Sequence, residues 1–208
     1  MLKKLAAAAT LALAAMLPLS AGAQEATADA AAPVEITDFS LGSPDAKVEI
    51  IEYASFTCPH CANFHATVWP KLKADYIDTG KVRFTYREVY FDRYGLWAAM
   101  VARCGGEMRY FGIADMLFEQ QREWAASDDP NVVVGNLRTI GKTAGLDDAA
   151  LDACLKDGAK AEAMVKHFET NFEADGVEGT PTFIINGDKH SNMSYDDMKV
   201  ILDEKLAE

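Results

Sequence analysis

Two cysteines, Cys58 and Cys61, stand two residues apart in the stretch YASFTCPHC, with Pro59 and His60 between them. Cysteines at this spacing can ligate a metal ion, close a structural disulfide or exchange disulfides with other proteins. Exchange requires a thiolate, which is favoured at a helix N-terminus and beside a positive charge. The surrounding elements therefore bear on which chemistry applies.

Three alternatives to disulfide exchange are weaker. A zinc site needs four clustered ligands, but Cys104 and Cys154 are distant in the sequence, and we expect no metal. Covalent haem attachment is excluded, because Ala62 stands where that motif needs a histidine. A disulfide closing so short a loop would stabilise the fold only weakly. The pair is therefore interpreted as redox-active, with a zinc site or a structural disulfide as the weaker possibilities.

The residues around the pair predict a strand followed by a helix. Val48 to Ala54 (VEIIEYA) is short and rich in branched and aromatic residues, as in a buried strand. From His60 to about Ile77, apolar residues recur every four positions, which predicts a helix that Pro70 bends. Cys58 is thus expected at a helix N-terminus, with His60 as its positive neighbour.

The rest of the chain predicts an α/β arrangement with a helical insertion. Lys81 to Val89 alternates apolar and polar residues as a second strand. Residues 93–175 carry helical patterns punctuated by glycine, with no evident strand. A third strand is predicted at Thr182 to Ile185, followed by a turn at Gly187-Asp188 and a last helix.

Residues 1–23 have the layout of a secretory signal peptide. Lys3 and Lys4 precede an apolar run over residues 5–19, and small residues at 21–23 form a cleavage site. The run is shorter than the roughly 20 apolar residues of a membrane span, so an uncleaved anchor is the weaker alternative. Residues 24–41 follow as a disordered leader and lead-in. We expect the protein to be exported and left soluble.

The formal net charge is −12 over 208 residues, of which 50% are hydrophobic. An acidic surface repels phosphate backbones and anionic lipid, so we expect no nucleic-acid partner. The length suits one domain that carries a large insertion.

Three features together resemble the DsbA family of thioredoxin-fold proteins, in a branch common in alpha-proteobacteria. They are the CPHC motif, the E-x-x-S-F sequence at the end of the strand before it, and GTPT at residues 179–182. The resemblance covers about residues 42–206. It implies a thioredoxin fold over residues 42–92 and 176–208, with an all-helical insertion over residues 93–175.

The family's functional residues carry over by position. Cys58 would be the attacking cysteine and Cys61 the resolving one. Pro181 would be the cis proline that faces them and, with Thr180, binds extended substrate; an ordinary trans proline is the alternative. Glu52 matches an acidic residue beneath the active site that could exchange a proton with Cys61. The alternative for Glu52 is a solvent-facing strand residue.

Two departures and one further cysteine pair complete the prediction. The best-known oxidase of the family has a glutamate where His65 stands here, and a valine where Thr180 stands, a position at which isomerases commonly have threonine. The direction of the reaction is therefore less certain than its type. Cys104 and Cys154 both fall in the insertion, and an even cysteine count in an exported chain favours a structural disulfide over two buried thiols.

We therefore expect a periplasmic thiol-disulfide oxidoreductase, monomeric and without a cofactor. It would introduce disulfides into unfolded or reduced exported proteins, and the resemblance implies reoxidation by a DsbB-like quinone-linked membrane oxidase. A disulfide isomerase or reductase is the alternative within enzymes. A peptide-binding chaperone with incidental cysteines is the alternative outside them.

Overall fold

The computed structural model describes residues 34–208, and the signal peptide expected at residues 1–23 lies outside the described residues. A five-stranded sheet with strand order β1-β3-β2-β4-β5 forms its centre. The strands are β1 (Phe39–Leu41), β2 (Val48–Ala54), β3 (Val82–Glu88), β4 (Thr182–Ile185) and β5 (Asp188–Ser191). β2 and β3 are parallel, and all other neighbours are antiparallel. This is a thioredoxin fold in which the strands on either side of the insertion pair through β2 and β4.

The side chains of β2 alternate between two apolar layers, as the period of a strand requires. Val48 and Ile50 belong to the main core, whereas Tyr53 packs with Phe172 of α8 (Gly158–Ala174) in a smaller cluster. Glu52 lies two residues after Ile50 and is fully buried, so a carboxyl group occupies a core position. The predicted alternative of a solvent-facing Glu52 is therefore wrong.

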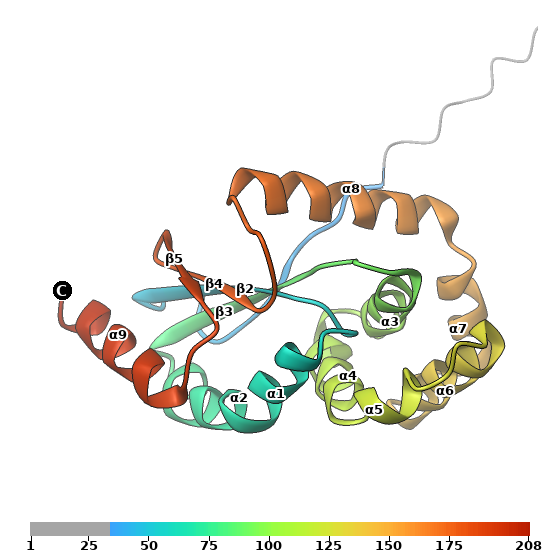
Figure 1. The fold of residues 1–208 in the computed structure, drawn as a ribbon, viewed down its shortest axis with the longest axis horizontal. Helices are drawn as coiled ribbons and strands as arrows, with labels where there is room; N and C mark the ends of the chain where they lie inside the picture. The colour runs from blue at the N-terminus through green and yellow to red at the C-terminus, as the bar shows by residue number, and fades with distance from the viewer. Residues whose placement is uncertain (1–33) are drawn as a thin grey trace, which may run out of the picture. The chain divides into compact units, whose positions relative to one another are not determined.

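Helices cover both faces of the sheet. In Figure 1, α8 lies on one side, and α1 (Pro59–Thr67), α2 (Trp69–Leu72) and α9 (Tyr195–Ala207) lie on the other. The helix expected over residues 60–77 is divided into α1, α2 and a π-helical turn, η1 (Lys73–Ile77). The division falls at Val68 because Pro70 has no N–H to continue the hydrogen bonds of α1 and instead occupies the first turn of α2.

The insertion consists of helices, as predicted. They are α3 (Arg93–Cys104), α4 (Glu107–Glu119), α5 (Gln121–Trp124), α6 (Pro130–Thr143) and α7 (Asp148–Leu155), followed by α8. A buried ion pair ties the insertion to β3: Arg103 donates to both carboxylate oxygens of Glu88 at 2.7 and 2.6 Å. The structure joins Cys104 to Cys154, with their Cα atoms 5.8 Å apart. No helix within residues 34–208 is both long and apolar enough to cross a membrane.

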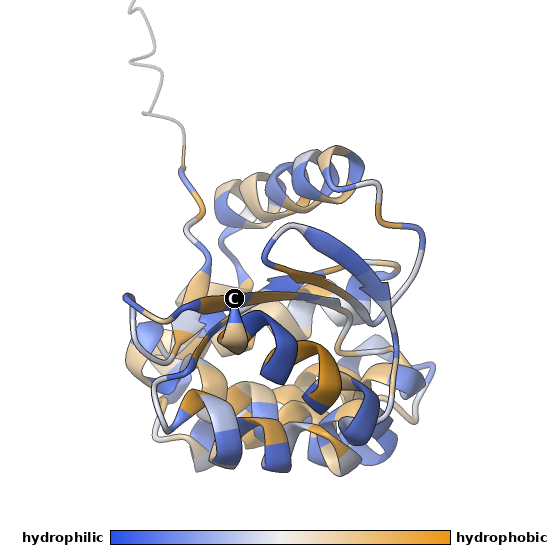
Figure 2. Cartoon of the chain, turned by 90° about the vertical axis from the view of Figure 1, so that its left-hand side faces the viewer, coloured by the Kyte–Doolittle hydropathy of each residue, from blue (hydrophilic) through white to orange (hydrophobic). Residues whose placement is uncertain are grey.

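Two edge strands were not predicted. β1 lies in the segment expected as a lead-in, and its three residues pair with β3. β5 begins at Asp188, so the turn predicted at Gly187-Asp188 is wrong by one residue and lies at Asn186-Gly187. Asn186 and Gly187 both have positive φ angles, which a two-residue hairpin turn needs and which these residue types adopt readily. The hydrophilic sequence of β5 suits its edge position, whereas hydrophobic residues dominate the central strands (Figure 2).

Candidate functional site

Cys58 caps the N-terminus of α1. Its backbone is extended, Pro59 occupies the first turn, and its sulfur accepts a hydrogen bond from the Cys61 N–H at 3.4 Å. Its thiol donates to the backbone oxygen of Thr180 at 3.5 Å. Cys58 is half-buried and Cys61 is buried, and both are free thiols. The structure thus places Cys58 where a reacting sulfur can be reached from outside and Cys61 behind it.

The two thiols differ in acidity. The pKa of Cys58 is lowered to about 5, chiefly by a hydrogen bond from the Cys61 thiol that outweighs its burial. The side chain of Thr180 and the backbone N–H groups of Cys61 and His60 lower that pKa further. The pKa of Cys61 is raised, first by burial, then by the hydrogen bond to Cys58 and the negative charge of Glu52. At neutral pH, Cys58 is therefore a thiolate and Cys61 a thiol.

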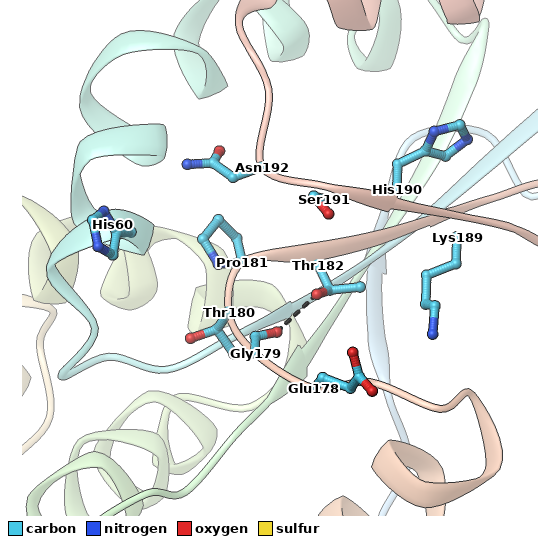
Figure 3. Close-up of a pocket in the computed structure, with 10 residues that line it drawn as sticks. All are labelled: His60, Glu178, Gly179, Thr180, Pro181, Thr182, Lys189, His190, Ser191 and Asn192. Carbon is cyan, nitrogen blue, oxygen red and sulfur yellow. Dashed lines mark hydrogen bonds between the residues drawn. The ribbon is translucent and has the colours of Figure 1, made fainter.

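The loop before β4 faces the cysteines. The Thr180–Pro181 peptide bond is cis, so the ordinary trans proline considered for Pro181 is not what the structure contains. An open cleft of about 530 Å³ lies between this loop, β5 and His60 (Figure 3). His60 is exposed, and its backbone N–H is one of the groups that lower the pKa of Cys58. The sequence had predicted a contribution from the imidazole charge and not from this backbone group.

Glu52 and His65 meet beneath the cysteines. The Nε2 atom of His65 lies 3.1 Å from Oε2 of Glu52, and the two side chains are 7% and 0% exposed. The sequence singled out both residues, Glu52 for its possible proton exchange and His65 as a departure, but did not predict their contact. The structure therefore unites them in one buried polar pair.

Two polar residues that the sequence analysis missed hold the loop before α1. Nε2 of the buried Gln121 donates to the carbonyl oxygens of Phe56 and Cys58 at 2.7 and 2.9 Å. On the other side of the loop, the hydroxyl of Thr57 donates to Asp92 at 2.6 Å. Gln121 comes from the insertion, which therefore fixes the backbone that carries the reactive sulfur. A single glutamine in a helical pattern carries no sequence signal for such a contact.

The chemistry available to this site is nucleophilic attack by, or on, a sulfur atom. An accessible low-pKa thiolate attacks disulfides, and a neighbouring thiol can displace the product. Within the described residues, no three His, Cys, Asp or Glu side chains are grouped to hold a metal ion. Cys104 and Cys154 belong to the insertion, where they form a disulfide, and are not part of the site around Cys58 and Cys61.

Comparisons with known proteins agree with this chemistry. A family model described as thioredoxin matches residues 34–204. A Rickettsia bellii protein named a protein-disulfide oxidoreductase is 34% identical over 178 residues, which cover 84% of this chain and 67% of that protein. Disulfide bond formation protein D of Bacillus subtilis is 27% identical, covering 80% of this chain and 76% of that protein.

The fold is also similar to solved structures. The crystal structure of alpha-DsbA1 from Wolbachia pipientis matches with a TM-score of 0.76 and 30% sequence identity, covering 82% of this chain and 92% of that chain. The Rickettsia relatives are longer than this chain, which spans about two thirds of their length.

Proposed function

Because this chain belongs to the DsbA-like branch of the thioredoxin family, we propose that it is an oxidase that introduces disulfides into exported proteins through Cys58 and Cys61. The observation that carries the proposal is the lowered pKa of Cys58, about 5, at the N-terminus of α1. Stabilising the Cys58 thiolate stabilises the reduced protein, and a stable reduced form makes the oxidised form a strong oxidant.

Oxidation proceeds in two exchanges. A substrate thiolate attacks Cys58 Sγ of the Cys58–Cys61 disulfide, and the electron pair of the broken bond goes to Cys61 Sγ, which takes up a proton. The second thiolate of the substrate then attacks the substrate sulfur that is bonded to Cys58, and Cys58 is released as a thiolate. The substrate leaves oxidised by two electrons, and the protein is left with one thiolate and one thiol. Glu52 is the group we assign to proton exchange with Cys61, because its charge acts on that thiol.

Substrate peptides would lie along the loop of Thr180 and Pro181, in the cleft beside His60. The Thr180 carbonyl is 3.5 Å from the reactive sulfur, so a chain bound against this loop would bring its own sulfur close to Cys58. This placement supports unfolded or reduced proteins as substrates, since they present extended backbone.

The oxidase would work in the periplasm as a monomer, after cleavage of the signal peptide expected at residues 1–23. A DsbB-like quinone-linked membrane oxidase would accept its electrons and restore the Cys58–Cys61 disulfide. Membership of the DsbA-like branch is the ground for these assignments.

The reduction potential tests the direction of the reaction. The protein is equilibrated in glutathione buffers, and the reduced fraction of Cys58 and Cys61 is counted by alkylation and mass spectrometry. We expect a potential less negative than about −180 mV, above that of an isomerase. A value near −270 mV, which is typical of thioredoxin, would contradict the oxidase proposal. A variant lacking Cys104 and Cys154 is the matched control and should give the parental value.

Disulfide isomerisation is the second candidate, and Thr180 is the observation that favours it. The Thr180 side chain acts on both thiols: it adds to the lowering of the pKa of Cys58 and partly opposes the raising of the pKa of Cys61. A hydroxyl in that position can assist release of a mixed disulfide, which an isomerase must do repeatedly. Efficient repair of a scrambled substrate, with little oxidation of a reduced one, would establish isomerisation in place of oxidation.

A further inference from the structure

A buried carboxyl group in the main core needs a partner, because an unpaired charge there is costly. Glu52 is fully buried among the apolar residues of β2, and its Oε2 atom is bonded to Nε2 of His65. Its other oxygen, Oε1, has no hydrogen-bond partner within residues 34–208. One oxygen of the carboxyl group is thus bonded to His65 and the other is buried without a partner, and the charge of the group raises the pKa of Cys61.

The ring of His65 links this buried carboxyl group to the surface. It stacks on Phe118 of α4, with ring centroids 3.9 Å apart and planes 16° from parallel. It also forms part of the wall of a groove of about 720 Å³, in the region where α1 and α4 lie side by side (Figure 1). Within the described chain, Nδ1 of His65 is buried and has no hydrogen-bond partner, although Nε2 is bonded to Glu52. The side chain therefore has one nitrogen bonded to Glu52 and one unpartnered nitrogen, which a water molecule entering from the groove would hydrogen-bond.

We propose that His65 carries protons between Glu52, beneath Cys61, and solvent in the groove between α1 and α4. The inference rests on the proposed disulfide exchange and concerns its second cysteine. Histidine suits the task, because an imidazole takes a proton on one nitrogen and releases one from the other near neutral pH. His65 acts through Glu52 and is a positioning residue rather than a group that touches the reacting sulfurs.

The proton follows the electrons in both directions. When substrate breaks the Cys58–Cys61 bond, Cys61 Sγ receives the electron pair and one proton, which the Glu52 carboxylate accepts from Nε2 of His65 and passes to the sulfur. His65 then takes a proton at Nδ1 from water that enters from the groove. On reoxidation by a disulfide, Cys58 first forms a mixed disulfide with it. Cys61 then passes its proton to Glu52 and His65, attacks Cys58 Sγ and releases the reduced thiol of the oxidant.

The groups around His65 can both assist and perturb this transfer. The titratable and charged residues that face it, its neighbours or the groove are Glu52 in β2, Tyr86 in β3, Cys61 in α1, Lys73 in η1, Asp115 and Glu119 in α4, and Arg122 in α5. Burial is the largest cause of the raised pKa of Asp115, and the positive charge of His65 opposes it. Asp115 also lines the groove and is therefore a second carboxyl group near His65.

The test separates the step of Cys58 from the step of Cys61. Reduced full-length mature protein is mixed with oxidised glutathione, quenched with acid, and analysed by mass spectrometry over time and pH. Formation of the glutathione adduct reports attack by Cys58, and its disappearance reports attack by Cys61. In His65→Gln, which keeps a donor to Glu52 but cannot carry a proton, we expect unchanged adduct formation and about tenfold slower resolution. Full general acid–base catalysis contributes about 10²–10⁴-fold, and Glu52 remains in this variant.

The matched control is His167→Gln, because His167 is also hydrogen-bonded to a carboxylate, Asp38, at 2.7 Å but lies on α8. It should resolve the adduct at the parental rate. Parental resolution in His65→Gln as well, at every pH, would overturn the inference while leaving the proposed function intact. A parent protein that forms no adduct and exchanges no disulfide would instead overturn the proposed function, and the inference with it.

Chemical rescue distinguishes proton transfer from packing. His65→Ala should also resolve slowly, and added imidazole should restore its rate in proportion to concentration. Thiazole, a ring of the same size that stays unprotonated near neutral pH, should not restore it. Equal rescue by both compounds, or rescue by neither, would mean that the ring of His65 only fills space and would overturn the inference.

Discussion

The two cysteine pairs of this protein differ in bonding state and in the length of chain that each pair encloses. Cys58 and Cys61 flank the first turn of α1 as free thiols, whereas Cys104 and Cys154 join α3 to α7 over a sequence separation of 50 residues. A disulfide between Cys58 and Cys61 closes a very short loop and restricts the unfolded chain little, but closing the long loop restricts it strongly. Loop length therefore distinguishes the pair whose disulfide can open and close during exchange from the pair whose disulfide stabilises the fold.

Local hydrogen bonding completes the contrast. Cys58 is reached by donors from α1 and from the loop of Thr180, all of which favour its thiolate. Cys61 lies one helical turn later and is buried near the Glu52 carboxylate, which favours its thiol. The difference in pKa between Cys58 and Cys61 thus comes from hydrogen bonds to Cys58, and from burial and one charged neighbour at Cys61, rather than from the motif alone.

Removing the reactive sulfur should have the largest effect. Cys58→Ser should reduce disulfide exchange to background, because the remaining thiol, Cys61, is buried and protonated at neutral pH. Oxidation of a reduced test protein measures the loss. Activity within a few-fold of the parent would mean that Cys61 or the pair in the insertion can react directly, and the comparison between pairs would fail.

Replacing Cys104 and Cys154 should lower the stability of the fold and leave disulfide exchange unchanged. The loop-entropy argument for a separation of 50 residues gives about 4 kcal/mol for Cys104→Ser with Cys154→Ser. For a domain of this size, each kcal/mol of lost stability lowers Tm by about 2–4 °C, so Tm should fall by roughly 10 °C. Exchange rates well below the melting range should match the parent. An unchanged Tm, or thiols found free in periplasm-derived protein, would remove the stabilising role.

Thr180→Val tests the contact that reaches both reactive thiols. The variant keeps the branched shape and removes a hydroxyl, a loss of about 0.5–1.5 kcal/mol for one hydrogen bond. That corresponds to no more than about one pKa unit at Cys58. We expect substrates to remain attached to Cys58 for a different time, and isomerisation of a scrambled substrate to change more than oxidation. If both assays give parental rates, Thr180 has no part in the mechanism.

His60→Ala should have the smallest effect. The substitution removes the imidazole but retains the backbone N–H that helps to lower the pKa of Cys58. We expect a weaker oxidant, with a potential more negative by less than about 30 mV, the equivalent of one pKa unit for a two-electron couple. Glutathione equilibration measures it, and an unchanged potential would assign the effect entirely to the backbone.

Much of this site could be predicted because its signals are local. Strand composition over residues 48–54 and the helical period after it place Cys58 at a helix N-terminus, where the structure has it. The cap of α9 is equally local, because the Ser194 hydroxyl accepts from the Asp197 N–H at 3.2 Å. Such features depend on residues within one or two turns of each other.

What could not be predicted depends on contacts between distant segments. β1 has only three residues, too few for a periodic pattern, and owes its structure to pairing with β3. The contact of Glu52 with His65 requires that α1 pack on the inner face of β2. The alternation of β2 did contain a signal, because Glu52 shares the spacing of Val48 and Ile50 and should therefore be buried and in need of a partner.

The titration of Cys58 tests the central claim most directly. Alkylation rates of both cysteines in the reduced protein are measured by mass spectrometry across pH, together with the thiolate absorbance. A group whose pKa is lowered stays ionised until the pH falls through that pKa, so labelling of Cys58 should persist at mildly acidic pH and decline around pH 5. Cys61 should remain unlabelled throughout this range. A Cys58 midpoint near the ordinary thiol value of about 8.5, or preferential labelling of Cys61, would contradict the account.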